Sequence, residues 1–437
     1  MARMRWAASL FLASTMLAGL ALGARADDLV TADRVGKADA PNTLVFRTNP
    51  DFTQTSPTAS QAAGFKELFQ AFAEKHPDWQ IQFQYFTPDI GGEHARMLEQ
   101  ARAGRAPDCA TVDSFQLALF IKNNALAPVD QYFTKDELAD LFPFVRSGIT
   151  GPDGHIYAWW WNTDIRVLYR NKDFVANPPQ TWADLKTAAL DAIKKGAQEG
   201  VLFNGGRWEG TAFDWLANFW AQGGKLVDDS GKPIFGEGDN RDKMLKALAY
   251  YKDLVDSGAA PKRVATIKDY ADFNAAALAG TTAMFLGGHW QHFQLKDAMK
   301  PDQFAKWDIS EFPGPSADQR STGAGGWTVA SLSKDPAKVK FCIDLVREVY
   351  MGPANEVMGQ LPTRASLFTN LKTFQDPFFA QIKQYLAHGQ ARPGVPIYPE
   401  ISNQIQIAMG DVLTGAKSPE QALDDAWKAV QAAYKKM

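Results

Sequence analysis

Cysteine is nearly absent from this 437-residue chain, which contains only Cys109 and Cys342. Two cysteines are too few for a disulfide-rich scaffold. Cys109 falls in a predicted strand and Cys342 in a predicted amphipathic helix, and these placements favour two buried thiols over a bridge. An oxidising compartment outside the cytoplasm would permit either state, so a bridge stays open as the alternative.

Long hydrophobic runs are also missing beyond the first residues of the chain. Arg3 and Arg5 precede an apolar run over 6–22, and the sequence Ala-Arg-Ala at 24–26 then supplies a small-x-small pattern. This pattern predicts a signal peptide over residues 1–26 that is cleaved after Ala26, and hence a periplasmic protein. No later stretch approaches ~20 apolar residues, and no cysteine stands at the cleavage point to carry a lipid.

Charge of one sign does not dominate, because 46 basic residues face 49 acidic ones and the formal net charge is −3. The chain therefore lacks the basic stripe that nucleic acid requires and the polybasic cluster that marks a membrane surface. The motifs GxxxxGK[ST], GxSxG and HExxH are absent, and GAGGW at Gly323 lacks the spacing of a dinucleotide loop. His289 and His292 have no third ligand nearby in the sequence. We predict no cofactor and no metal.

The first part of the chain alternates strand and helix patterns. Strands are predicted at 43–47, 79–85 and 106–113, with helices over 60–77, 93–103 and 114–123. This β-α-β-α-β order is typical of an open, mostly parallel sheet wrapped by helices. Ligands bind outside the carboxyl ends of such strands, which makes the loop at 48–60 and the pair Asp113-Ser114 a candidate site. Turn chemistry and helix capping are the alternative interpretation.

An aromatic and polar segment at 154–174 carries the clearest functional signal. Three consecutive tryptophans are followed closely by amide, carboxylate and guanidinium groups: Trp159, Trp160, Trp161, Asn162, Asp164 and Arg166. A sugar stacks its apolar C–H face on an aromatic ring and offers its hydroxyls to such planar polar groups. The segment therefore suits a carbohydrate, although a buried aromatic strand with one structural ion pair explains the same residue types.

Helical patterns dominate residues 181–258, and the last helix is predicted to start at the cap Ser418 with Pro419 in its first turn. Trp208 precedes one of these helices, whereas Phe219 and Trp220 lie at core spacing within it. Further strands are predicted at 281–286 and 327–332, and Trp290 follows the first of them.

Several blocks occur together in a familiar order: FKELFQAFAEKHPDWQIQFQYF, GRAPDCATVD, DGHIYAWWWNTDIRVLYRNKDF, TWADL, AALAGTTAMFLGGHW, FPGP with GGWTVASLSKDPAK, and LPTRASLF. In this order the chain resembles the carbohydrate-binding extracellular solute receptors of ABC importers, the maltose-binding-protein-like group. The resemblance implies an α/β, two-lobed periplasmic-binding-protein fold of type II, each lobe a mostly parallel sheet wrapped by helices, with a multi-strand hinge. We place residues 27–157 with 285–332 in lobe 1, and 158–284 with 333–437 in lobe 2.

The resemblance also assigns roles to individual residues. Asp164 stands where the group has an acidic residue that binds sugar hydroxyls, and Trp290 where it has a stacking aromatic. Trp208 and Glu209 are similar to a ligand-contacting loop, whereas Arg364 in LPTR matches a turn in which helix capping is an equal alternative. The predicted ligand-binding set is Asp113, Trp160, Asn162, Asp164, Arg166, Trp208, Glu209, Trp290, Trp327 and Arg364.

These observations lead us to expect a monomeric receptor rather than an enzyme. It would capture a di- or oligosaccharide by lobe closure and deliver it to an inner-membrane ABC permease, without binding nucleic acid. One alternative keeps the fold and changes the ligand to a glycerol phosphodiester, a sulfosugar or a sugar alcohol, with Arg166 and Arg364 serving an anionic group. Another is a secreted glycoside hydrolase that uses Glu209 with Asp214 or Asp164.

Overall fold

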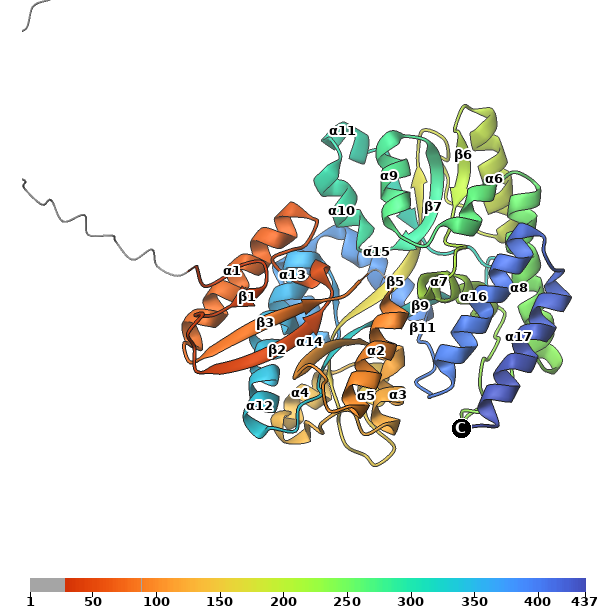
Figure 1. Cartoon of the computed structure of the whole chain (residues 1–437). Coiled ribbons are helices and arrows are strands. Elements are labelled where there is room, and N and C mark those ends of the chain that lie inside the picture. Colours follow the sequence, from red (N-terminus) through yellow and green to blue (C-terminus); the bar gives the residue numbers. More distant parts are fainter. Residues whose placement is uncertain (1–27, 88) are drawn as a thin grey trace, which may run out of the picture.

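The computed structural model describes residues 28–87 and 89–437 (Figure 1). The predicted signal peptide and its cleavage point after Ala26 lie outside the described residues. Within the described ranges, none of the helices combines the length and apolar character needed to span a bilayer.

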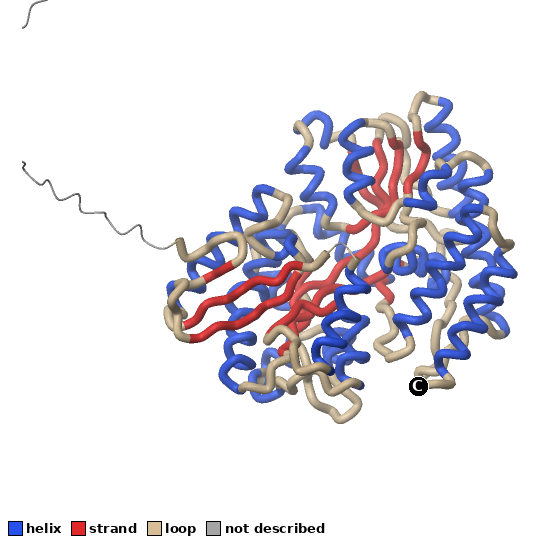
Figure 2. Tube along the Cα trace, viewed as in Figure 1, coloured by secondary structure: helices blue, strands red, loops and turns tan. Residues whose placement is uncertain are grey.

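The strands form one mixed sheet that passes through the whole molecule (Figure 2). Its main path runs β1-β3-β2-β4-β9-β5-β7-β6, and β8, β10 and β11 pair with strands of that path. The strands are β1 (Arg34–Val35), β2 (Asn42–Thr48), β3 (Trp79–Tyr85), β4 (Cys109–Asp113), β5 (Trp159–Asn171), β6 (Glu199–Leu202), β7 (Thr282–Gly288), β8 (Trp307–Ser310), β9 (Thr322–Ser331), β10 (Leu361–Pro362) and β11 (Gly389–Gln390).

Lobe 1 contains the predicted β-α-β-α-β unit. Strands β2, β3 and β4 pair in parallel, and α1 and α2 connect them. The buried residues of α1 recur every three or four positions, including Phe65, Phe69 and Phe72, as the helical spacing predicts. The lobe-1 helices are α1 (Ala59–Lys75), α2 (Ile90–Arg102), α3 (Leu117–Lys122), α4 (Lys135–Asp140), α5 (Pro143–Ile149), α12 (Pro336–Leu345) and α13 (Asn355–Met358).

Lobe 2 surrounds the parallel pair β6–β7 and the second half of β5 with helices. Ser418 caps the last helix and Pro419 occupies its first turn, as predicted. The helices are α6 (Trp182–Lys194), α7 (Glu209–Trp220), α8 (Gly238–Asp256), α9 (Ala271–Ala279), α10 (Gln291–Ala298), α11 (Pro301–Phe304), α15 (Pro377–Tyr385), α16 (Tyr398–Thr414) and α17 (Pro419–Tyr434), while α14 (Ala365–Asn370) touches the cores of both lobes.

The two lobes are defined by separate hydrophobic cores, and these cores divide the chain differently from the predicted boundaries. The first core takes residues between 30 and 161 and again between 329 and 358, whereas the second takes those between 165 and 324 and between 361 and 430, together with Phe115. The segment 285–312 thus packs with lobe 2, because β7 and β8 pair with the second half of β5. The segment 339–358 packs with lobe 1, where α12 covers its sheet.

The chain crosses between the cores three times, within β5, within β9 and near residues 358–361. Strands β5 and β9 pair antiparallel over most of the junction, with a register shift between Trp160 and Asn162. The α/β two-lobed fold with several connecting strands is confirmed. The lobe-2 sheet is less parallel than predicted, because β6 and β7 pair in parallel but β5 pairs antiparallel with β7 and β8.

The prediction of two buried thiols is wrong. Cys109 in β4 and Cys342 in α12 form a disulfide, with Cα atoms 5.9 Å apart. Both are buried, as expected. The sequence concealed the bridge because 233 residues separate the cysteines, and only the return of the chain to lobe 1 at α12 brings them together.

Candidate functional site

The tryptophan run at the start of β5 belongs to the core of lobe 1. Trp159 stacks on Phe133 with ring centroids 4.3 Å apart, and Trp161 is fully buried against Phe52. Trp160 is also buried and donates through Nε1 to the carbonyl of Asn162 at 2.7 Å. Trp160, predicted to bind ligand, therefore faces packed side chains, and the alternative of a buried aromatic strand describes this run.

The residues directly after the run lie where the two lobes meet. Arg166 on β5 is buried and holds two carboxylates, since Nε donates to Asp214 at 2.7 Å and Nη1 donates to Asp164 at 2.6 Å. Asp164 also accepts from the backbone N–H of Gly325 on β9. Tyr270 donates to Asp214 and receives a bond from Arg166 Nη2. Burial raises the pKa of Asp214, against the effect of these donors.

A second arginine, Arg392, occupies the same junction and was not predicted. It follows β11 and its Nη2 donates to Asp113 at 2.6 Å, while Nη1 donates to Glu209 at 3.0 Å. Asp113 ends β4 in lobe 1, and Glu209 begins α7 in lobe 2. Glu209 also accepts from Tyr398 at 2.9 Å and from Ser402. Burial raises the pKa of Asp113 to about 6, although Arg392 opposes the rise.

Aromatic rings cover both arginines. The guanidinium carbon of Arg392 lies 3.9 Å from the ring centroid of Phe213 and 4.3 Å from that of Phe115. The guanidinium carbon of Arg166 lies 4.1 Å from Phe213 and 5.0 Å from Trp290. All four contacts are cation–π interactions. We refer to the following residues as the interlobe cluster: Asp113, Phe115, Asp164, Arg166, Glu209, Phe213, Asp214, Tyr270, Trp290 and Arg392.

Partly exposed tryptophans border this cluster in lobe 2. Trp290 follows β7 and meets the Tyr270 ring edge-on at 5.0 Å, and Trp208, the residue before α7, meets the same ring at 5.2 Å. Trp208 Nε1 is buried without a hydrogen-bond partner. Both rings offer an apolar face and Trp208 adds an unused donor, a combination that suits a hydroxylated ligand.

The lobe-1 side is lined by Trp327 on β9. Its ring lies near His94 and Phe52, at 6.2 and 5.4 Å between centroids, and is partly exposed. Its backbone N–H donates to Asn162 Oδ1 at 2.8 Å, whereas Asn162 Nδ2 is buried and without a partner. His94 Nε2 accepts from the backbone N–H of Asp113. Asn162 and Trp327, both predicted, therefore lie beside the cluster.

Two further predicted features, Arg364 and the loop at 48–60, lie at different places relative to the lobe junction. Arg364 precedes α14 and donates to Asp140 at 2.8 Å on the lobe-1 surface, away from the interlobe cluster. The loop at 48–60 does face lobe 2, because Ser60 donates to Asp297 at 3.2 Å. In this loop burial and the charge of Asp269 raise the pKa of Asp51 to about 6.

The interlobe cluster is acidic in balance. Two guanidiniums face four carboxylates, those of Asp113, Asp164, Glu209 and Asp214. Both arginines are therefore already neutralised by protein groups. Among the described residues no group of three or more His, Cys, Asp or Glu side chains is arranged to hold a metal ion.

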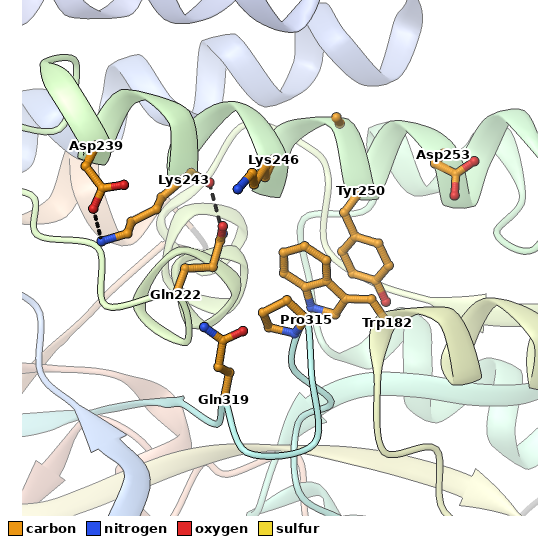
Figure 3. A pocket seen from close by; sticks show the side chains of 10 residues that line it. Trp182, Gln222, Asp239, Lys243, Lys246, Tyr250, Asp253, Pro315 and Gln319 are labelled. Atoms are coloured by element: carbon orange, nitrogen blue, oxygen red, sulfur yellow. Dashed lines mark hydrogen bonds and ion pairs between the residues drawn. The ribbon is translucent and has the colours of Figure 1, made fainter.

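Two surface pockets lie outside the cluster. One, of about 550 Å³, opens on the outer side of lobe 2 between α6, α8 and the loop before β9 (Figure 3). Its wall contains Trp182 stacked on Tyr250 at 4.5 Å, together with Lys243 and Gln319. The other, of about 620 Å³, lies against α4 and α5 in lobe 1. Neither pocket contains a predicted site residue.

Four cluster residues escaped sequence reasoning, Phe115 beside Arg392 among them. Arg392 stands in a loop, in the segment ARPGVP, with no strand or helix pattern around it. Phe213 lies in a helix whose aromatic residues have core spacing, and Tyr270 lies just before α9. A usable signal for Arg392 was an isolated arginine next to a proline in an otherwise apolar loop.

Comparison with known proteins agrees with this architecture. The family model of the bacterial extracellular solute-binding proteins matches residues 56–345, and the chain belongs to this family. The chain is 26% identical over 236 residues to the maltotriose-binding protein of Pyrococcus abyssi, a match that covers 53% of this chain and about half, 48%, of that relative.

Two further similarities extend over more of the chain. It is 25% identical over 396 residues to the sn-glycerol-3-phosphate-binding periplasmic protein UgpB of Yersinia enterocolitica, covering 82% of this chain and 86% of UgpB. An ABC transporter solute-binding protein of Thermotoga lettingae, solved with α-D-tagatose bound, superposes with a TM-score of 0.76 at 26% identity, covering 89% of this chain and 98% of that one.

Proposed function

We propose that this protein is the sugar-binding component of an ABC importer, which closes its two lobes around a neutral di- or oligosaccharide. The observation that carries the proposal is the interlobe cluster, where carboxylates, guanidiniums and partly exposed tryptophan rings from both lobes meet. Ring faces would take the apolar faces of the pyranoses, and the polar groups would take their hydroxyls.

The charge balance of the interlobe cluster favours a neutral ligand over an anionic one. The names of two relatives point to different chemistries, maltotriose in one and glycerol 3-phosphate in the other. A phosphate or sulfonate needs arginines whose positive charge is not already matched, yet Arg166 and Arg392 each pair with two carboxylates. An added anion would meet a net negative cluster, so an uncharged ligand fits better.

Unused donors next to the cluster support a hydroxylated ligand. Asn162 Nδ2, Trp208 Nε1 and Arg392 Nε are buried without partners. Buried donors in this state carry a desolvation cost of about 1–3 kcal/mol each, which hydroxyl oxygens of a sugar would relieve.

A glycoside hydrolase is less well supported by the same contacts. Such an enzyme needs one carboxylic acid free to give a proton and one carboxylate free to attack. Glu209 accepts from Arg392, Tyr398 and Ser402, and Asp214 accepts from Arg166, Tyr270 and Asn204. Side chains held in this way suit binding, and we propose no catalytic step.

The remaining parts of the proposal concern location and partners. We infer a periplasmic protein, exported through the signal peptide at 1–26, that acts as a monomer and presents its closed form to an inner-membrane permease. Family membership supports the extracellular setting, and the Cys109–Cys342 disulfide suits an oxidising compartment.

A thermal-shift screen with product analysis tests the proposal. The purified protein is heated with maltose, maltotriose, tagatose, glycerol 3-phosphate, a glycerol phosphodiester and a sulfosugar. We expect a rise in Tm with a neutral saccharide that is recovered intact. A rise confined to the anionic compounds would overturn the choice of ligand, and a cleaved saccharide would overturn the choice of a receptor over a hydrolase.

A further inference from the structure

Strand β5 contains one residue more than its partner β9 at the lobe junction. The pairing steps from Trp160 with Thr328 to Asn162 with Trp327, so two residues of β5 lie opposite one residue of β9. Such a β-bulge shifts the alternation of side chains along the strand by one position. Residues before and after the bulge therefore point to different faces of the sheet from those that a regular strand would give them.

The shift places the polar residues of β5 on the opposite face from Trp160. The partners of Trp160 and Asp164 on β9, residues 328 and 325, are an odd number of positions apart, so the two pairs lie on opposite faces. The Trp160 ring points to α5, where it meets Phe144 edge-on at 5.6 Å. In a regular strand Asp164 and Arg166 would lie on that same face. The bulge instead directs them to the interlobe cluster.

On the cluster side, β9 carries glycine opposite these polar residues. A Cβ atom added at Gly323 would lie 2.7 Å from the Phe213 ring, and one at Gly325 would lie 2.7 Å from Arg392 Nη2. Such contacts leave no space for a side chain. The two glycines thus provide the room in which Phe213 and Arg392 pack beside Arg166, and this room is useful only if the bulge turns Arg166 toward it.

Side-chain donors hold the backbone of the bulge. Three consecutive carbonyl oxygens of β5 each accept a hydrogen bond from a buried side chain. The donors are Thr363 Oγ1 to Trp160, Asn355 Nδ2 to Trp161 at 3.1 Å, and the Trp160 Nε1 to Asn162 at 2.7 Å. Because these groups are buried, loss of a donor leaves a carbonyl unsatisfied and loosens the bulge.

The residue of β9 beside the bulge also has to be glycine. Gly326 has a φ of 144°, which side chains rarely allow. A Cβ atom there would overlap the carbonyl oxygen of Asn162 and lie 2.7 Å from Trp160 Nε1. A larger residue at 326 would therefore disturb the same hydrogen bond that Trp160 makes.

We propose that Trp160 is a positioning residue for ligand binding, because its indole N–H holds the bulge that turns Asp164 and Arg166 toward the interlobe cluster. This role rests on the proposed function, in which those two side chains take sugar hydroxyls. Trp160 thus acts on the ligand through the backbone of Asn162, although its ring packs on the other face of the sheet.

Two matched substitutions test this role in the full mature chain. Trp160→Phe keeps an aromatic ring and removes the N–H that bonds to Asn162. Trp159→Phe is the control, because Trp159 is buried next to it on the same strand and its Nε1 has no hydrogen-bond partner in the described part of the chain. Gly326→Ala disturbs the bulge from β9.

Two measurements are made on each variant. The NMR signal of the Arg166 Nε–H, which donates to Asp214 at 2.7 Å, reports the placement of Arg166 without ligand. Isothermal titration with maltotriose reports binding. Trp160→Phe should shift the Arg166 signal and raise the Kd about fivefold, since a loosened bulge lowers the fraction of binding-competent protein. Gly326→Ala should do the same. Trp159→Phe should lower Tm as Trp160→Phe does and leave the signal and the Kd unchanged.

Three results would overturn the proposal: an unmoved Arg166 signal in Trp160→Phe, a shifted signal with an unchanged Kd in that variant, or an equal effect of Trp159→Phe. Trp160→Phe decides the matter if Gly326→Ala does not fold. If the unsubstituted protein does not bind maltotriose, the choice of ligand fails instead, and the Arg166 signal still decides whether Trp160 positions this side chain.

Discussion

Two groups of tryptophans, similar in sequence context, have opposite environments. Trp159, Trp160 and Trp161 stand side by side on β5 and are all buried, whereas Trp208, Trp290 and Trp327 stand singly and are partly exposed. Successive strand residues point to opposite faces of a sheet, so three adjacent tryptophans can all be buried only where both faces are covered. The single tryptophans lie at a helix start, after a strand end and on a strand at the lobe junction, where a ligand can reach a ring.

The largest effect expected from this contrast is a loss of stability in the first group. Trp161→Ala removes a fully buried ring that packs on Phe52 and Tyr350, and should cost about 3–5 kcal/mol of unfolding free energy. Denaturant unfolding measures the loss, and the protein that remains folded should bind ligand normally. A stable variant with impaired binding would place the tryptophan run in the ligand site after all.

A pH effect should appear beneath Trp327, where burial lowers the pKa of His94 to about 4 from its usual 6.5. His94 is then neutral in the folded protein but takes a proton in the unfolded chain below pH 6.5. Above pH 6.5 the His94 ring is neutral in both states and does not affect the free energy of unfolding. As the pH drops from 6.5 towards 4, the unfolded chain takes up a proton that the folded protein does not, so the free energy of unfolding falls by up to about 3 kcal/mol. NMR titration of the His94 ring, with denaturant unfolding across this range, checks the sign. A midpoint above 6 would contradict it.

In the second group, Trp290→Ala should weaken saccharide binding by about tenfold or more and shift Tm by only a few degrees, because the ring is partly exposed. Isothermal titration with the saccharide found in the screen measures the change. Trp182→Ala is the control, since Trp182 is also partly buried in lobe 2 but borders the outer pocket. Unfolding of Trp290→Ala would assign this residue to the core instead.

The smallest effect concerns a carboxylate between the aromatic groups. Asp164→Asn leaves Arg166 with one charged partner and should raise the Kd severalfold, on the order of 1 kcal/mol, without changing the fold. Asp308→Asn is matched to it, because Asp308 pairs with Arg170 farther along the same strand. Equal Kd values in Asp164→Asn and the unsubstituted protein would remove Asp164 from the site.

Local patterns predicted most elements because their causes are local. The spacing of Phe65, Phe69 and Phe72 defines α1, and Ser418 with Pro419 defines the start of α17. The lobe boundaries and the disulfide depend on contacts between segments far apart in the sequence. A local hydrophobic pattern contains no information about such contacts. The path of 339–358 back to lobe 1 is one such return.

The candidate site was predicted where a polar residue follows a strand or begins a helix. Asp113 at the end of β4, Glu209 at the start of α7 and Trp290 after β7 fit this description. Asp164 and Arg166 lie within β5, directly after the tryptophan run, and join them in the cluster. Arg392 and Phe213 could not be found in this way, because their roles depend on each other and on two glycines of a distant strand. Whether these residues bind a ligand stays a prediction.

The shared strands also limit how this molecule can be taken apart. Strands β5 and β9 each supply residues to both cores. Expressing one lobe alone by cutting the gene at a single point would therefore remove a central strand from that lobe and expose an unpaired sheet edge. Biosensor builders who wish to insert a reporter domain should therefore choose a surface turn such as the one around Gly231, and leave the crossings uncut.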